Sequence, residues 1–274
     1  MIGLGSNRLT IARRGGMSVT QAGRGGMEWL AGGRMPSWAS PYSAQATAAL
    51  KAQFPTQWPT IRDYGFAHPE IVPYVNAYVP DYTDFIYVLI PTLGYTLRIS
   101  RSGGAYIDSG INPQVSPRCV ADMIMNNHSD TDYWGNNSIS NSTYFTNFAG
   151  GALAYYRYGS TGGANAGGYT AVGTRHTWDV GKKVYVDGTL TYTSPNTYAY
   201  NSGQINILIF RCGRSNGADF TLYSFTIYDG DTKVREMYPY IKDGVSGMLD
   251  LVTGTFFDNK NGSGSFTISK VASS

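Results

Sequence analysis

The chain has 274 residues, which is enough to bury a sizeable core as one large domain or two modest ones. Charged residues make up only 14% of it, while glycine and tyrosine occur 34 and 22 times, which favours β-rich structure with many turns over helix bundles. The net charge of +3 is too small to imply nucleic-acid binding across the whole molecule, and no apolar run approaches the length that crosses a membrane.

Residues 1–35 form a glycine-rich, basic zone with no apolar period to support a core of its own. A short echo, RRGGM at 13–17 and GRGGM at 23–27, runs through it, and Glu28 is its one acid. Such a composition predicts an extended arm that is flexible in isolation and becomes ordered against a partner, with folding back onto its own domain as the alternative. The zone lacks interleaved aromatic residues, so we expect its arginines to anchor the chain to other protein subunits rather than to nucleic acid. These anchor residues are Arg8, Arg13, Arg14, Arg24 and Arg34.

Residues 36–94 mix prolines with aromatic residues, and the prolines limit the length of any helix or strand. We predict two short helices, over 43–53 (SAQATAALKAQ) and 69–77, and then an apolar strand within PDYTDFIYVLIP at 80–91. This zone is interpreted as a collar or linker that packs on the main domain or on a partner.

Residues 95–274 predict a run of short strands without intervening helices, typical of an antiparallel β-sandwich of the jelly-roll type. Asp187-Gly188 and Asp229-Gly230-Asp231 mark the turns of two hairpins. INILIF at 205–210 is continuously apolar and predicts a strand buried on both faces. The expected strands cover 96–100, 105–107, 118–125, 144–148, 152–158, 169–172, 183–186, 189–193, 205–211, 221–228, 233–238, 247–252, 255–258 and 265–269.

Four stretches of this last zone resemble one known family. They are AYIDSGINPQVSPRCVADM (105–123), RYG (157–159), TRHTWDVGKKVYVDG (174–188) and SFTIYDGDTKVREMYPYIKDGVSGMLDLVTGTFFDNKNGSGSF (224–266). Their order and spacing are similar to those of the concanavalin A-like, laminin-G-like jelly-roll domains that are common in virion proteins of phages and prophages. The resemblance covers about the last 170 residues and implies a concanavalin A-like jelly roll in a virion assembled in the host cytoplasm, with capsid or tail subunits as partners.

Catalytic patterns are missing from the sequence. A glycosidase needs two carboxylates that flank the sugar bond, but no pair of acids alternates on one predicted strand. The three histidines occur without a serine in a Gly-x-Ser-x-Gly elbow, and no spacing of cysteine and histidine fits zinc. We therefore expect no enzymatic activity. Cys119 and Cys212 lie in apolar runs, and two buried free thiols are favoured over a disulfide.

The segment NNHSDTD at 126–132 is rich in side-chain oxygens. Asn126, Asp130 and Asp132 predict calcium ligands, although a polar loop whose side chains cap turns is the favoured interpretation. The aromatic residues Tyr133 and Trp134 follow directly, and with Tyr156 they are the candidates for stacking on the sugar rings of a glycan. Ordinary packing of a tyrosine-rich β protein is the alternative for these three.

Three functions follow from these features. The favoured one is a virion structural protein, a homo-oligomer whose arm docks on a capsid or tail and whose jelly roll decorates the particle and contacts host or mucus glycans. The second is a carbohydrate-binding module of a bacterial surface, which should carry an export signal or lipid anchor that we do not find in the N-terminal residues. The third, a glycan-cleaving enzyme, is disfavoured by the missing carboxylate pair.

Overall fold

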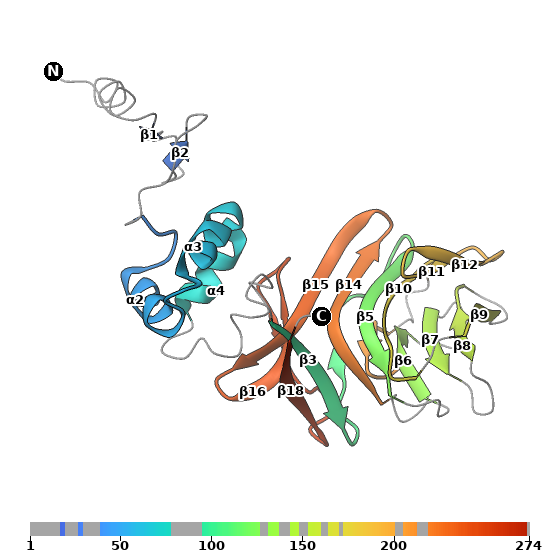
Figure 1. The fold of residues 1–274 in the computed structure, drawn as a ribbon. Helices are drawn as coiled ribbons and strands as arrows, with labels where there is room; N and C mark the ends of the chain where they lie inside the picture. The colour runs from blue at the N-terminus through green and yellow to red at the C-terminus, as the bar shows by residue number, and fades with distance from the viewer. Residues whose placement is uncertain are drawn as a thin grey trace.

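The computed structural model describes residues 17–19, 27–29, 39–77, 95–126, 131–136, 143–147, 153–159, 164–169, 172–200, 205–212 and 219–272. They form a mainly β molecule in which two antiparallel sheets share one core and a small helical unit lies at one end (Figure 1). The predicted strand within 80–91 and the five arginines of the arm lie outside the described residues. Within the arm, β1 (Met17–Val19) pairs with β2 (Met27–Trp29).

The helical unit contains the two helices that the sequence predicts and one that it does not. Helix α2 (Ala44–Gln53) begins after Ser43, whose hydroxyl accepts a hydrogen bond from the amide of Ala46 and so caps the first turn. The 3₁₀ turn η1 (Pro69–Ile71) leads into α4 (Val72–Ala77), which confirms the second predicted helix. The third helix, α3 (Trp58–Ala67), was not predicted. It tolerates Pro59 because this residue lies in the first helical turn, where a missing amide hydrogen costs nothing.

In the part of the chain that the structure describes, the larger sheet has ten strands and the smaller has six. In the larger sheet the order is β12-β11-β10-β5-β14-β15-β16-β17, with β3 paired to β14 and β18 paired to β3. Its strands are β3 (Tyr95–Ser102), β5 (Pro117–Met125), β10 (Arg175–Val180), β11 (Lys183–Val186), β12 (Thr189–Thr193), β14 (Phe220–Asp229), β15 (Thr232–Lys242), β16 (Val245–Asp250), β17 (Phe256–Phe257) and β18 (Ser265–Ala272). The smaller sheet runs in the order β4 (Ile107–Asp108), β13 (Leu208–Ile209), β6 (Thr131–Asn136), β7 (Thr143–Asn147), β8 (Leu153–Arg157) and β9 (Ala164–Tyr169).

Aromatic side chains join the two sheets. Trp134 and Phe145 of the smaller sheet stack with their ring centroids 4.5 Å apart. Phe145 lies 4.8 Å from Trp178, and Trp134 meets Phe225 edge-on at 5.4 Å, both partners belonging to the larger sheet. The sheets are therefore packed face to face around one apolar core, as a sandwich requires.

Most predicted strands are confirmed, with three differences. Strand β6 lies where the sequence predicted an acidic loop, and β10 was implied only by the family resemblance. The strand predicted over 169–172 lies earlier in the chain, since β9 ends at Tyr169. The run Ile207–Phe210 is buried as expected, although only Leu208–Ile209 forms ladder pairs. Cys119 and Cys212 are buried free thiols, as predicted.

The predicted hairpin at Asp187-Gly188 joins β11 to β12. Both residues have positive φ, 49° and 78°, as a two-residue hairpin turn of the primed type requires. Gly230 and Asp231 make the turn between β14 and β15, which confirms the second hairpin.

The two ends of the larger sheet have different outer surfaces. At the β15–β16 end, Tyr240 and Leu249 point away from the shared core and join the core of the helical unit, with Phe256 packed against it. Toward β14, β5, β10 and β11, the outward-facing side chains are instead mostly charged or polar, with Val120 and Ile124 of β5 as apolar exceptions. That half of the face holds the candidate site.

Candidate functional site

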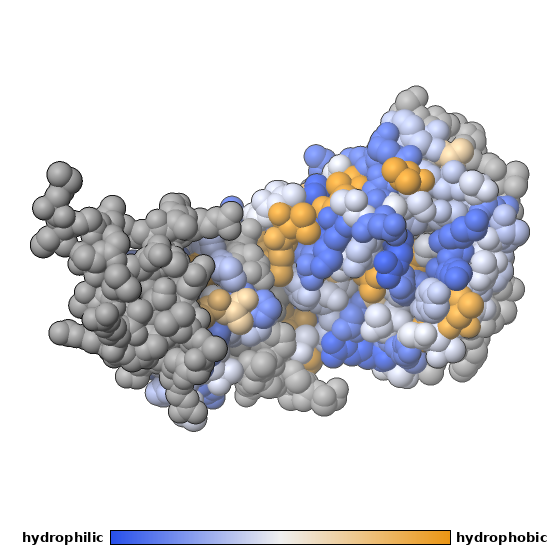
Figure 2. All heavy atoms as spheres, turned by 90° about the horizontal axis from the view of Figure 1, so that it is seen from above, coloured by the Kyte–Doolittle hydropathy of each residue, from blue (hydrophilic) through white to orange (hydrophobic). Residues whose placement is uncertain are grey.

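A groove of about 960 Å³ lies on the outer face of the larger sheet. It crosses β11, β10, β5, β14 and β15 and is bordered by the β10–β11 and β14–β15 turns. Viewed from above in Figure 2, the described surface of the sandwich is mostly hydrophilic, with small, separate hydrophobic areas. The surface is thus better supplied with hydrogen-bonding groups than with apolar contact area.

Strand alternation places the groove side chains in two rows. Successive residues of a strand point to opposite faces, and β5 accordingly buries Cys119, Ala121 and Met123 in the core and turns its even-numbered residues outward. The strand registers align these outward residues across the sheet. The rim row contains Lys183, Arg118, Tyr228 and Lys233, and the inner row contains Tyr185, Asp179, Val120, Thr226 and Glu236.

The rim and inner rows are tied together by ion pairs. The Arg118 guanidinium donates two hydrogen bonds of 2.7 Å to the carboxylate of Asp179. Lys233 donates to Glu236 at 2.7 Å. These hydrogen bonds raise the pKa of Arg118 and that of Lys233. Two of the acids in the groove are therefore matched with cations, an arrangement that fixes the orientation of these side chains.

A similar clamp lies further along the same face. Arg175 donates two hydrogen bonds, of 2.8 and 2.6 Å, to Asp122, and this hydrogen bonding raises the pKa of Arg175. Each arginine also covers an aromatic ring: Arg175 lies 3.8 Å from the centroid of Tyr223, and Arg118 lies 4.6 Å from that of Tyr228. The face is thus braced by planar groups in fixed orientations.

Glycine makes room for the Arg118 clamp. Gly181 follows the last residue of β10, and a Cβ at this position would lie 3.1 Å from the Cβ of Arg118. Lys182 follows in the turn, and Lys183 begins β11. Both are exposed and make no ion pair with any other residue that the structure describes. These two lysines are the cations of the groove that have no acid opposite them.

Half-buried tyrosines and hydroxyl groups complete the lining. Tyr185 and Tyr228 occupy two different rows, and threonines stand between the charged residues. Aromatic faces with neighbouring hydroxyl, amide and carboxylate groups can bind the apolar face and the hydroxyls of a sugar. The threonines are Thr177, Thr193 and Thr226.

The helical unit adjoins the groove through Tyr238. On β15 this residue lies two positions after Glu236, and its hydroxyl donates to a Glu236 carboxylate oxygen at 3.4 Å. Burial, followed by the charge of Glu236, raises its pKa to about 12, and Tyr64 of α3 is near enough to add to the shift. The groove and the helices therefore meet at one residue.

The prediction that Tyr133 and Trp134 present exposed rings to a glycan is wrong. Both lie on β6 and expose only 0% and 1% of their surface, because that strand is central in the smaller sheet and their rings fill the core. Tyr156 lies on β8, where its backbone pairs with Phe145, and its side chain is outside the described part of the structure.

The predicted calcium ligands have other roles where the structure describes them. Asn126 donates its side-chain amide to Asp219 at 2.9 Å across the β5–β14 pair, and Asp132 is 5% exposed within β6. Asp130 falls outside the described residues. Among those described, no three His, Cys, Asp or Glu side chains cluster as metal ligands would.

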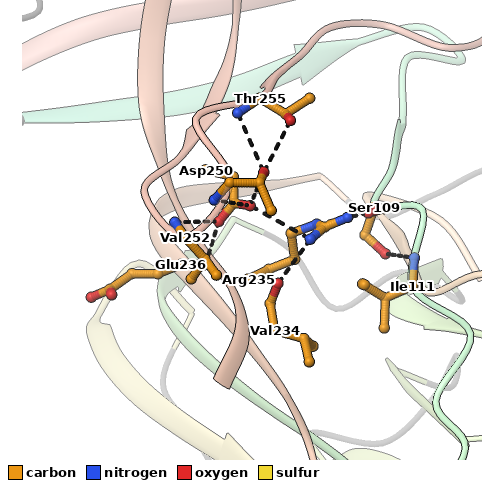
Figure 3. A network of polar contacts seen from close by, with 9 residues as sticks. Ser109, Ile111, Val234, Arg235, Glu236, Asp250, Val252 and Thr255 are labelled. Atoms are coloured by element: carbon orange, nitrogen blue, oxygen red, sulfur yellow. Dashed lines mark hydrogen bonds and ion pairs between the residues drawn. The ribbon is translucent and has the colours of Figure 1, made fainter. Parts of the chain in front are cut away.

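A second charged cluster, around Asp250, is structural (Figure 3). Asp250 has no exposed surface, and its carboxylate accepts hydrogen bonds from the amides of Glu236 and Val252 at 2.8 and 3.1 Å. Arg235 lies 3.6 Å from the same carboxylate and donates to the carbonyl of Ser109 at 3.0 Å. The cluster therefore holds the turn after β16 and connects it to the segment after β4.

Comparison with known proteins adds no family assignment. No protein-family model matches this chain, and no curated protein matches its sequence. None of the helices in the described ranges has the length and apolar character needed to span a bilayer. The groove itself is therefore the main basis for a functional argument.

The groove residues were not among the sites predicted from the sequence. Their signal is the outward-facing half of an alternating strand, as in Arg118-Cys119-Val120-Ala121-Asp122 on β5, where buried cysteine and alanine separate the outward-facing residues. Which charges would pair could not be predicted, because Arg118 and Asp179 are 61 residues apart in the chain.

Proposed function

We propose that this chain is a non-enzymatic structural protein of a virion, in which an N-terminal arm docks on the particle and a jelly-roll domain, displayed outward, binds glycans in the groove of its larger sheet. The virion role and the jelly-roll topology rest on the family resemblance of residues 105–266. The glycan role rests on the groove.

One observation carries the glycan role: the carboxylates of the inner row, Asp179 and Glu236, are each held by a cation at 2.7 Å. A retaining or inverting glycosidase needs one carboxyl group protonated and the other free to attack or to activate water. Carboxylates neutralised by Arg118 and Lys233 favour hydrogen bonding to sugar hydroxyls instead. Binding without cleavage is the consequence.

The test is glycan binding measured together with hydrolysis. The purified chain is applied to an array of bacterial and mucin glycans, and the affinity of each hit is measured by calorimetry. Tyr228→Ala should weaken binding about tenfold, equivalent to about 1.4 kcal/mol, because it removes a stacking ring. Tyr200→Ala is the matched control, since Tyr200 is 43% exposed and does not line the groove.

Hydrolysis is followed by the release of reducing ends from every glycan that binds. We expect none from the wild type and no change with Glu236→Gln. Sugar release by the wild type that Glu236→Gln abolishes would replace the binding role with an enzymatic one. Equal loss of affinity in Tyr228→Ala and Tyr200→Ala would remove the groove as the binding site.

A further inference from the structure

The charges along the groove are unevenly matched. Among the residues that the structure describes, the lining contains four cations and three acids. Arg118 is bound to Asp179, and Lys233 is bound to Glu236. Asp231, the remaining acid, stands in the β14–β15 turn, on the opposite side of the groove from the β10–β11 turn. Lys182 and Lys183 thus give the β10–β11 side an uncompensated positive charge.

The lysines stand beside a stacking surface. Lys183 and Tyr185 are two residues apart on β11, so they point to the same face with a separation of about 7 Å along the strand. That separation is on the order of one sugar residue. A pyranose lying on Tyr185 would place a substituent of its neighbour against Lys183, and an exposed lysine attracts a negative group there.

We infer that the groove selects acidic polysaccharides, chains that carry carboxylates on their sugar rings, with the sugars on Tyr185 and Tyr228 and the carboxylates at Lys182 and Lys183. This inference rests on the proposed glycan-binding function. The threonines and paired carboxylates of the groove would hydrogen-bond sugar hydroxyls, which the backbone of DNA lacks. A uronic-acid polymer therefore fits this mixed lining better than DNA does.

The test uses two matched pairs of polymers, polygalacturonate with its methyl ester and hyaluronate with its carboxyl-reduced form. Each pair shares a backbone and differs in charge. The full chain should bind the acidic member of at least one pair tenfold or more tightly at 50 mM salt, and the difference should shrink at 500 mM because salt screens exposed charges.

Two double variants assign the selectivity to the lysines. Lys182→Gln/Lys183→Gln should bind both members of the pair with similar affinity. Lys260→Gln/Lys270→Gln loses the same charge away from the groove and should keep the preference. A preference that survives in the first double variant, or that disappears equally in both, would overturn the inference.

These outcomes distinguish a failure of the selectivity for acidic sugars from a failure of the proposed glycan-binding function. Equal binding of the acidic and neutral members, weakened by Tyr228→Ala, would leave the glycan site in place and remove only the selectivity for acids. Tighter binding to a single-stranded DNA oligomer than to either acidic polymer would also overturn the inference. If none of the four polymers or the arrayed glycans binds, the glycan role and the selectivity are both wrong.

Discussion

At the level of single residues, a carboxylate without exposed surface organises the closing segment of the sandwich. Besides the two amides already described, Asp250 accepts hydrogen bonds from the amide and the hydroxyl of Thr253, at 3.2 and 2.6 Å. Its own amide donates to the carbonyl of Thr255 at 2.9 Å. Hydrogen bonds to this one side chain thus take the place of ladder hydrogen bonds where the chain turns from β16 toward β17. A buried charge persists there because its partners compensate the cost of desolvation.

We expect Asp250→Ala to lower the free energy of unfolding by about 3–5 kcal/mol, because it removes the counter-charge of Arg235 and the acceptor of three partly buried amides. Urea denaturation at pH 7 measures this change. Asp258→Ala is the control, since Asp258 is exposed and its loss should change stability by no more than about 0.5 kcal/mol. A loss below about 1 kcal/mol for Asp250→Ala would contradict the structural role.

At the level of elements, patterns confined to one strand or turn were predicted well. The turns at Asp187-Gly188 and Gly230-Asp231 could be predicted, because glycine and aspartate are among the few residues that adopt the positive φ needed in such turns. Strands β11 and β12 were placed at their observed bounds.

What failed depended on partners distant in the chain. Strand β6 begins with Thr131-Asp132, the end of a predicted polar loop with calcium ligands as the alternative, and continues with the two aromatic residues that were candidates for stacking on a glycan. Only its pairing with β13 and β7 shows that Tyr133 and Trp134 fill a core. The groove was missed for the same reason, since its rows exist only once five strands are in register.

Helix α3 offers a test of the packing within the helical unit. Tyr42 donates its hydroxyl to the carbonyl of Ile61 at 2.8 Å, and burial raises the pKa of that phenol. The ring passes directly over Gly65, where any Cβ would overlap its hydroxyl. In an open helix Gly→Ala stabilises by about 1 kcal/mol, so a loss of stability at this position reports the contact.

We expect Gly65→Ala to lower the free energy of unfolding by about 1–3 kcal/mol, because Tyr42 must leave its place. Combining it with Tyr42→Phe, which removes the nearest atom, should cost less than the sum of the two single changes. The double-mutant cycle is measured by urea denaturation. Stabilisation by Gly65→Ala alone would show that α3 is not packed against this ring.

At the scale of the whole molecule, two apolar cores share one sheet. The inner face of the larger sheet packs on the smaller sheet, and the outer face at its β15–β16 end completes the core of the helices through Tyr240 and Leu249. The collar predicted for residues 36–94 is therefore fixed to the sandwich in its helical part. Because the helices cover one end of that face, the groove is left as its open part.

Among the described residues, the first members of the two cores are Tyr42 and Ile99. Deleting residues 1–35 should therefore leave the melting temperature and the β-type circular dichroism of the chain unchanged, while abolishing its incorporation into the parent particle. Incorporation is measured by quantifying the chain in particles purified after complementation with the truncated form.

A variant in which Arg8, Arg13, Arg14, Arg24 and Arg34 are all glutamine serves as the control for charge. Its loss from the particle would assign docking to the arginines, and its retention would assign docking to the glycine-rich backbone. If the truncated chain is incorporated as well as the full chain, the arm is not the anchor, and the virion role must rest on the helical unit or the sandwich.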